Sequence, residues 1–206
     1  MNKPLNALFK EKNLVMHLYG LPGTYKTTFL AQIIQKKLEE GCEHVYLIDS
    51  GGNFPIIRLK SIKHLLQKMI VFHPRSLEEE AKLLDDLHIK VLDHDSVLFI
   101  DDIFSHTNLE DKTNIHLNSY ILAQISTISR VIEFPIVLTN QARSYENKIR
   151  PFLHKLTSYY FDWHFLFEKS EKSNIILVSL FKKDKYTTQG KYKVNSLGFL
   201  ALKDFS

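Results

Sequence analysis

The fold of this chain is decided by nine consecutive residues: Gly20-Leu21-Pro22-Gly23-Thr24-Tyr25-Lys26-Thr27-Thr28. The apolar run Leu14–Tyr19 before them is too short for an ordinary helix and predicts a buried strand. The segment Thr27–Glu40 has helical spacing and is followed by Gly41, a residue type favoured just past a helix end. A loop between a strand and a helix presents backbone N–H groups that bind phosphate oxygens. The stretch therefore predicts a phosphate-binding loop of the Walker A type.

Two side chains of this loop predict that its ligand is a nucleoside triphosphate with Mg²⁺. Lys26 would reach the β- and γ-phosphates, and the Thr27 hydroxyl would complete the coordination of Mg²⁺. All nine residues from Gly20 to Thr28 are candidate nucleotide-binding residues. Tyr25 departs from the motif, because glycine, which allows positive φ and close approach to phosphate, usually precedes the lysine. The alternative interpretation is a glycine-containing turn that precedes Lys-Thr by chance.

A second apolar strand, predicted over Ser96–Ile100, ends in two carboxylates, Asp101 and Asp102. A carboxylate at a strand end can hold the hydration shell of Mg²⁺ opposite Thr27, and we assign that role to Asp101. Asp102 has two interpretations, a base that orients water and a cap for the following turn, and the cap is favoured. Many strands end in aspartate at a turn, so this assignment depends on the phosphate-binding loop upstream.

The order of the predicted elements indicates an α/β fold. Further helices are predicted over Ser76–Leu92, where Ser76 and Glu79 form a capping box, and over Thr113–Ile132. Strands that alternate with helices imply a mostly parallel sheet with helices on both faces. The last third predicts successive strands, which implies an antiparallel extension on one edge of the sheet.

Seven more strands complete this prediction: His44–Ile48, Met69–Phe72, Pro135–Leu138, Tyr159–Phe167, Asn174–Phe181, Lys191–Asn195 and Phe199–Leu202. No repeat or linker interrupts the pattern, so we expect residues 1–206 to form a single domain.

Composition and charge exclude several classes of protein. The chain has one cysteine, Cys42, which excludes a disulfide framework or a cysteine-rich zinc cluster within it and suits an intracellular setting. No stretch approaches the roughly 20 apolar residues of a membrane span, and no signal-peptide pattern is present, so we expect a cytoplasmic protein without a membrane partner. The net charge of +4 is compatible with nucleic acid without establishing it.

Three further segments, in order, resemble the RecA/RadA recombinase superfamily. Residues 45–54, with the sequence VYLIDSGGNF, and the Arg58-Leu59 pair resemble the family's second strand and turn, and residues 70–74 stand where its next strand is expected. Residues 134–141, FPIVLTNQ, are similar to the strand that leads into the family's DNA-facing loop. The resemblance implies a RecA-like P-loop NTPase core that binds ATP. It covers the whole chain and leaves no part for a helix-hairpin-helix domain, so the chain looks most like the short RadB-like archaeal RadA paralogues.

The same resemblance shows that one catalytic group is missing. The family's water-activating glutamate falls on Gly51, which has no side chain to orient or deprotonate water. Together with Tyr25, this predicts weak or absent ATP hydrolysis, and Asp49 or Asp102 would be the next candidates for a base. The resemblance implies that Gln141 senses the γ-phosphate. The alternative for Gln141 is a buried amide that satisfies local backbone groups.

Basic residues in the last third predict contacts with polyanions. Segment 142–158 interleaves cations with aromatic residues, and Arg143, Lys148 and Arg150 are its candidates for binding single-stranded DNA. The resemblance implies that Lys183 and Lys185 contact the ATP of a neighbouring subunit, although they can also neutralise DNA phosphates. The alternative for both groups is a solvated surface loop or hairpin.

The function that the resemblance implies is that of an accessory recombinase paralogue in homologous recombination and DNA repair. It would bind ATP, single-stranded DNA and a recombinase partner, plausibly as a hetero-oligomer. Three alternatives stay open: a KaiC-like regulatory ATPase that acts through protein contacts, a small-molecule P-loop kinase, and a scaffold that has lost ATP. The kinase is disfavoured because such enzymes need an arginine-rich lid, whereas this chain ends in strands.

Overall fold

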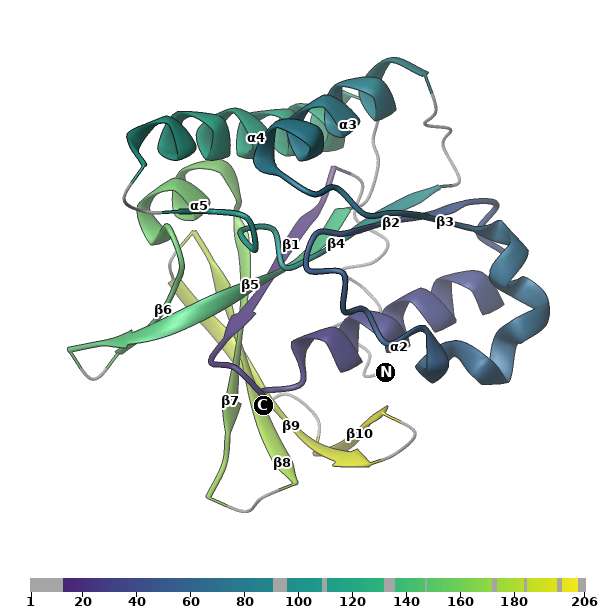
Figure 1. The fold of residues 1–206 in the computed structure, drawn as a ribbon. Coiled ribbons are helices and arrows are strands. Elements are labelled where there is room, and N and C mark those ends of the chain that lie inside the picture. The colour runs from purple at the N-terminus through teal and green to yellow at the C-terminus, as the bar shows by residue number, and fades with distance from the viewer. Residues whose placement is uncertain are drawn as a thin grey trace.

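The computed structural model describes residues 13–90, 96–108, 111–131, 136–146, 148–171, 174–183, 185–195 and 198–203. These residues form an α/β fold around one sheet (Figure 1). Its strands are β1 (Val15–Gly20), β2 (Val45–Asp49), β3 (Met69–Phe72), β4 (Val97–Asp101), β5 (Ile136–Tyr145), β6 (Lys148–Pro151), β7 (Trp163–Lys169), β8 (Ile175–Lys182), β9 (Lys185–Asn195) and β10 (Gly198–Lys203). Its helices are α2 (Lys26–Glu39), the 3-10 helical segment η1 (Ile56–Lys68), α3 (Leu77–Lys90), α4 (Lys112–Val131) and α5 (His154–Tyr160).

The sheet has a parallel centre and an antiparallel extension, as the sequence predicts. Its order is β10-β9-β8-β7-β1-β5-β4-β2-β3, and all neighbours from β7 to β3 are parallel. Strands β8, β9 and β10 follow β7 in antiparallel order. Strand β6 pairs with the far end of β5 and makes a hairpin that projects from the sheet (Figure 1).

Helices cover both faces of the parallel centre. Helix α2 and η1 lie on one face, and α3, α4 and α5 lie on the other (Figure 1). The core on the α2 side includes Phe29, which packs edge-on against Phe167 and Phe199 at ring-centroid distances of 5.2 and 5.1 Å. Burying such rings supplies much of the hydrophobic stabilisation. None of the described helices is long and apolar enough to cross a membrane.

The predicted helix ends have a local chemical cause. Gly41 has a φ of 92°, and its N–H donates to the Leu38 carbonyl while the Cys42 N–H donates to that of Lys37, so α2 ends in a Schellman motif as expected. At the start of α3 the Glu79 N–H donates to the Ser76 hydroxyl at 3.3 Å. The Glu79 carboxylate accepts from the N–H of Arg75, one residue earlier than a standard capping box.

One predicted strand begins too early. Tyr159 and Tyr160 belong to α5, and β7 starts only at Trp163. The run of aromatic residues favours a strand locally, but Leu156 and Tyr160 pack against the core under α4, and the Phe161 N–H donates to Thr157 in a helical turn. The segment expected as a loop, 142–158, contains the end of β5, β6 and the start of α5. Four positions named in the sequence analysis lie outside the described residues. They are the predicted helix ends Leu92 and Ile132, and Phe134 and Pro135 at the start of segment 134–141.

A directed chain of hydrogen bonds joins β5, β1 and β7 on the side of α5. The Asn140 amide donates to His17 Nε2 at 3.0 Å and to the Phe152 carbonyl at 3.0 Å. His164 Nε2 must donate to the Phe161 carbonyl at 2.9 Å, so its Nδ1 accepts from Nδ1 of His17 at 2.8 Å. Both rings are buried, and burial lowers the pKa of His17 well below its usual value, with His164 and His154 adding to the effect. The arrangement therefore suits two neutral imidazoles.

Gly20 is the position where the sheet and the phosphate-binding loop leave least space. A Cβ there would lie 2.4 Å from the Phe167 carbonyl oxygen and 2.7 Å from Thr24 Oγ1. We expect Gly20→Ala to lower the free energy of unfolding by roughly 2–3 kcal/mol, because backbone of β7 would have to move. Urea denaturation followed by circular dichroism measures the decrease.

Gly51→Ala is the matched control for this substitution. A Cβ at Gly51 would have only Asn53 Nδ2 near it, at 3.9 Å, which is an ordinary contact. We expect that variant to change stability by no more than about 0.5 kcal/mol. Equal decreases in the two variants would contradict the proposed clash.

Candidate functional site

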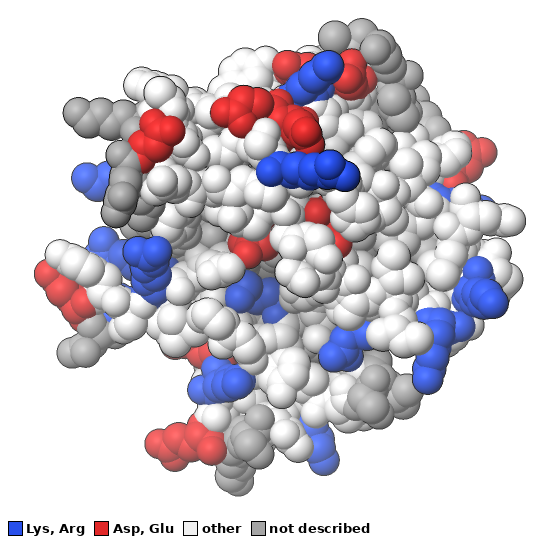
Figure 2. Space-filling view, viewed as in Figure 1, with Lys and Arg blue, Asp and Glu red and all other residues white. Residues whose placement is uncertain are grey.

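The carboxyl ends of the parallel strands bring the predicted site residues to one edge of the sheet. Gly20 at the end of β1 is in register with Gln141 of β5, and Asp49 of β2 is in register with Asp101 of β4. Acidic and basic side chains meet in the middle of the face shown in Figure 2. In open α/β sheets, ligands bind outside this edge.

The loop from Gly20 to Lys26 has the backbone of a phosphate cradle. Gly23 has a φ of 76° and Tyr25 a φ of 66°, so both adopt the left-handed conformation. The Thr24 hydroxyl donates to the Leu21 carbonyl at 2.9 Å and closes the turn. The backbone N–H groups of the first turn of α2 then have no partner within that helix, which suits an anion.

Tyr25 keeps the conformation that glycine has in the motif. A non-glycine residue in this region costs on the order of 1–2 kcal/mol. Its ring packs against the core on the α2 side, and Lys169 Nζ lies 5.8 Å from the ring centroid. The tyrosine is thus accommodated by packing its ring against the protein.

Lys26 is folded back onto the loop. Its Nζ donates to the carbonyls of Gly20 at 2.8 Å and Leu21 at 3.3 Å. Burial lowers the pKa of Lys26, and the charges of Asp102 and Asp101 act in the opposite direction. The ammonium group is therefore held at the mouth of the cradle.

Asp101 and Thr27 meet as the sequence predicts. The Thr27 hydroxyl donates to Asp101 Oδ1 at 3.1 Å, and the Thr139 hydroxyl donates to the same oxygen at 2.7 Å. Burial raises the pKa of Asp101 despite these two bonds, and the charges of Asp49 and Asp102 add to the rise. A buried carboxylate beside a threonine hydroxyl is a suitable donor pair for a divalent cation.

Asp102 and Gln141 form a second polar contact at the edge. Gln141 Nε2 donates to Asp102 Oδ2 at 2.6 Å, and the Asp102 N–H donates to the Thr139 hydroxyl at 2.7 Å. The two interpretations of Asp102, a base and a cap, stay predictions. The buried-amide alternative for Gln141 was wrong, because this side chain is exposed. Burial raises the pKa of Asp102.

The position of the family's glutamate carries no carboxyl group. Gly51 is exposed in the turn after β2. Asp49, two residues earlier, accepts from the N–H groups of Asn53 and Phe54 at 3.2 and 3.0 Å and lies 3.5 Å from His73. Its two oxygens hold the turn, and Asp49 stays a predicted candidate for a base.

Glu80 is a carboxyl group near this edge that the sequence analysis missed. It lies in the first turn of α3, is fully buried, and neither oxygen has a hydrogen-bond partner of good geometry among the described residues. Burial raises the pKa of Glu80 to about 8, the Ser50 hydroxyl opposes the rise, and Asp102 adds to it. Glu80 is therefore mainly neutral at pH 7. A glutamate in the first turn of a helix is ordinary, so no sequence signal marks it.

The predicted cationic residues lie in two separate places. Arg143, Lys148 and Arg150 are exposed on the β5–β6 hairpin, where Arg143 and Arg150 are direct cross-strand partners. Lys183 and Lys185 flank the β8–β9 turn, and Lys183 Nζ lies 4.0 Å from Asp162, which precedes β7. This turn is at the start of β7, whereas the phosphate-binding loop lies beside the end of that strand. Neither lysine therefore belongs to the chain's own loop.

Comparison with known proteins identifies the relatives of this fold. The DNA repair and recombination protein RadB of Methanococcus maripaludis is 32% identical over 192 residues, which cover 87% of this chain and 86% of that protein. The RadB of Methanocaldococcus jannaschii is 27% identical over 176 residues, or 80% of this chain and 81% of its own. The chain belongs to the RadB family. Its fold also matches a crystal structure of the RadB recombinase with a TM-score of 0.79 at 20% identity, covering 98% of this chain and 97% of that chain.

A second family model agrees with the P-loop part of the RadB fold. The NB-ARC domain, itself a P-loop NTPase domain, matches residues 1–128, which include the phosphate-binding loop and Asp101. A P-loop NTPase fold implies the use of a nucleotide and Mg²⁺. The chain is a RecA/RadB-like recombinase paralogue, and these relationships do not favour the KaiC-like or kinase alternatives.

The buried carboxyl group of Glu80 predicts an unusual dependence of stability on pH. Its folded pKa of about 8 exceeds the unfolded value of about 4.3, so the unfolded chain releases a proton that the folded chain keeps. This group's contribution to the free energy of unfolding is fully present below about pH 4 and is lost as the pH rises towards 8. Each pH unit between the two values corresponds to about 1.4 kcal/mol.

We therefore expect Glu80→Gln to become more stable relative to wild type as the pH rises, because glutamine stays neutral. Urea denaturation at pH 5, 6, 7 and 8 measures the difference. Glu39→Gln on α2 is the control, because it makes the same chemical change at an exposed position. A Glu80→Gln difference that is constant across these pH values would show that the buried group is ionised in the folded protein.

Proposed function

We propose that this RadB-family protein binds ATP and Mg²⁺ at residues 20–28, hydrolyses ATP slowly or not at all, and assists a recombinase in homologous recombination and DNA repair. One observation supports the proposal: residues 20–26 have the backbone of a phosphate cradle, whereas Gly51 stands where the resemblance puts the family's water-activating glutamate. ATP then acts as a ligand that orders contacts, and its hydrolysis contributes little.

The residues present fit ATP and Mg²⁺. The cradle from Gly20 to Thr28 would hold the phosphates, with Lys26 exchanging its two carbonyl partners for phosphate oxygens. Thr27 and Asp101, which already contact each other, would hold Mg²⁺. Bound Mg·ATP would supply a γ-phosphate that orders its neighbours and whose phosphorus water can attack, with ADP as the leaving group.

The carboxyl groups near the cradle are poorly suited to activating that water. Asp49 holds the turn after β2, and Asp102 is engaged by Gln141. Glu80 is buried behind the turn. A water molecule at the γ-phosphate therefore lacks a positioned base, which general-base catalysis requires.

Gln141 is positioned to couple binding of the γ-phosphate to the conformation of the β5–β6 hairpin. It lies in β5, in register with Gly20 of β1. Its side-chain amide can exchange Asp102 for a phosphate oxygen. Strand β5 continues without a break into the hairpin that carries Arg143. Movement of Gln141 would thus be transmitted along one strand.

The β5–β6 hairpin is the proposed site for single-stranded DNA. It presents Arg143, Lys148 and Arg150 with Tyr145, whose side chain is 60% exposed. Arg143 lies over the Phe152 ring at 5.2 Å and Arg150 over the Tyr145 ring at 5.9 Å. Cations beside exposed aromatic rings bind phosphates and stack on unpaired bases without sequence preference.

The β8–β9 turn is the proposed contact with a recombinase or paralogue subunit. Lys183 and Lys185 are exposed there, and the 4.0 Å contact with Asp162 is a weak surface pair. Because these lysines lie far from the chain's own loop, they are free to reach the ATP of a neighbouring subunit.

Two substitutions test nucleotide binding and the missing base together. Lys26→Ala should weaken ATP binding roughly tenfold or more, because it removes a charge-assisted hydrogen bond to the phosphates. Gly51→Glu should raise ATP turnover roughly tenfold or more, because the open space there admits a side chain that can orient water. Calorimetry measures the first and steady-state phosphate release the second.

The double variant Lys26→Ala/Gly51→Glu controls for contaminating activity and should show no such rise in turnover. Rapid hydrolysis by the wild-type protein that disappears in Lys26→Ala would contradict the proposal, because a base would then already be present.

A salt titration tests the DNA proposal. Binding of a single-stranded oligonucleotide should weaken as salt rises, because each cation that neutralises a phosphate releases counterions. Replacing Arg143, Lys148 and Arg150 by Ala should reduce the slope of log affinity against log salt by about 0.7 for each phosphate that is no longer neutralised. Lys63→Ala, an exposed lysine on η1, is the matched control. An unchanged affinity of the triple variant at low salt would remove the hairpin as the site.

A further inference from the structure

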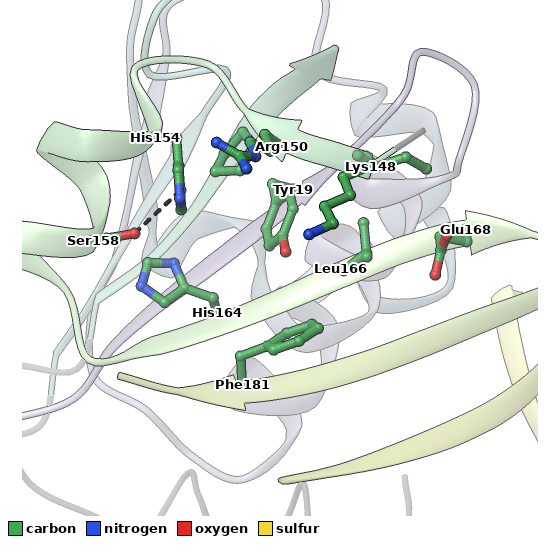
Figure 3. A pocket seen from close by; sticks show the side chains of 11 residues that line it. Tyr19, Lys148, Arg150, His154, Ser158, His164, Leu166, Glu168 and Phe181 are labelled. Atoms are coloured by element: carbon green, nitrogen blue, oxygen red, sulfur yellow. Dashed lines mark hydrogen bonds between the residues drawn. The ribbon is translucent and has the colours of Figure 1, made fainter. Parts of the chain in front are cut away.

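A cavity of about 540 Å³ lies between the β5–β6 hairpin and the sheet, apart from the phosphate-binding loop. Strand β6 and the start of α5 form one wall, and β1, β7 and β8 form the other (Figure 3). The size is in the range of small-molecule sites. The cavity shares Lys148 and Arg150 with the hairpin proposed to bind DNA.

Aromatic rings form part of the sheet wall. Tyr19 lies in the middle of the cavity and Phe181 lies on the β8 side (Figure 3). Tyr19 is nearly buried and packs with Leu166, whereas Phe181 is half-buried and has Tyr186 edge-on at 5.9 Å. Rings held by such contacts lose little entropy when a flat ligand stacks on them.

Charged groups line the same cavity without neutralising one another. Lys148 and Arg150 come from the hairpin side, and Glu168 lies at one end of the sheet wall (Figure 3). Among the described residues, the side chains of Lys148 and Glu168 form no hydrogen bond or ion pair, and burial raises the pKa of Glu168. The unpaired side chains of Lys148 and Glu168 leave hydrogen-bonding capacity for a ligand, and Arg150 adds a second cation that lies over the Tyr145 ring.

The combination defines the chemistry of that ligand. A purely apolar molecule would leave the charged groups without partners, at a free-energy cost. A nucleotide unit matches all three features: a flat base for the rings, base N–H groups for the Glu168 carboxyl, and a phosphate for the cations. Lys148 and Arg150 belong to the hairpin that is proposed to bind single-stranded DNA. We therefore expect the nucleotide unit in the cavity to be part of a strand bound at that hairpin.

We propose that this cavity receives one unpaired base of a single-stranded nucleic acid, stacked on Phe181 and flanked by the buried Tyr19, with its phosphate on Lys148 and Arg150. The inference rests on the proposed binding of single strands by the hairpin and adds a specific receptor to it. Tyr19 is followed directly by Gly20, so the base receptor and the phosphate-binding loop share strand β1.

The experiment compares two labelled 12-nucleotide strands on the full chain at low salt by fluorescence anisotropy. One strand is poly(dT) and the other carries the same phosphates without bases. We expect the wild-type protein to bind the strand with bases about tenfold more tightly, since stacking on an aromatic side chain contributes on the order of 1–3 kcal/mol per base. Phe181→Ala should lose that preference and leave the affinity for the strand without bases unchanged.

Tyr159→Ala is the matched control, because Tyr159 on α5 is 80% exposed and does not line the cavity. Phe181→Leu provides a second variant that keeps apolar volume in the sheet and lacks the ring face. The wild-type comparison of the two strands is independent of how any variant folds.

The outcomes separate the base receptor from the hairpin site. Salt-dependent binding of both strands with equal affinity would overturn the base receptor and leave the hairpin site standing. Binding of neither strand would overturn both. Free dTMP that matches the affinity of the strand in a Phe181-dependent manner would show a mononucleotide site and overturn the assignment to a strand. A preference for bases that Phe181→Ala abolishes and Tyr159→Ala keeps would support the receptor.

Discussion

The hydrogen bond from Thr27 to Asp101 is the contact on which the site depends, because it connects the first turn of α2 with the end of β4. Thr139 donates to the same oxygen from β5, so one carboxylate oxygen joins three elements of the P-loop fold. In a buried environment such bonds hold strongly, since breaking one leaves a polar group without a partner. The parallel register then fixes where Gly20, Asp101 and Gln141 lie relative to one another.

The site collects more carboxyl groups than its cations neutralise. Asp101, Asp102 and Glu80 all have a raised pKa, and burial is the main cause in each case. Lys26 is the cation whose charge lies close to both aspartates. A site of this kind favours a ligand that carries a divalent cation and disfavours bare anions. The surplus of acid groups does not create a catalytic base, because a useful base must contact the attacking water.

The sequence predicted the elements that depend on local chemistry and missed those that depend on packing. The phosphate-binding loop, the Thr27–Asp101 pair and the order of parallel and antiparallel strands all follow from short motifs and periodicity. The burial of Glu80 could not be predicted, because three consecutive glutamates begin α3 and only the packing of the turn after β2 selects one of them. The side-chain partners of Asp102 and Gln141 likewise depend on the register between β4 and β5. The cavity is lined by residues far apart in the chain, from Tyr19 to Phe181, so no local pattern marks it.

The hydrogen-bond chain through Asn140, His17 and His164 runs in one direction and contains no spare proton position. A proton added to His164 Nδ1 would face the Nδ1–H of His17 at 2.8 Å, and a proton added to His17 Nε2 would face the Asn140 amide N–H at 3.0 Å, so either one turns attraction into repulsion. The strands that meet there lead to the phosphate-binding loop and to the hairpin proposed to bind DNA. Protonation of either ring would therefore loosen the molecule from its interior, at the joint between its two proposed ligand sites.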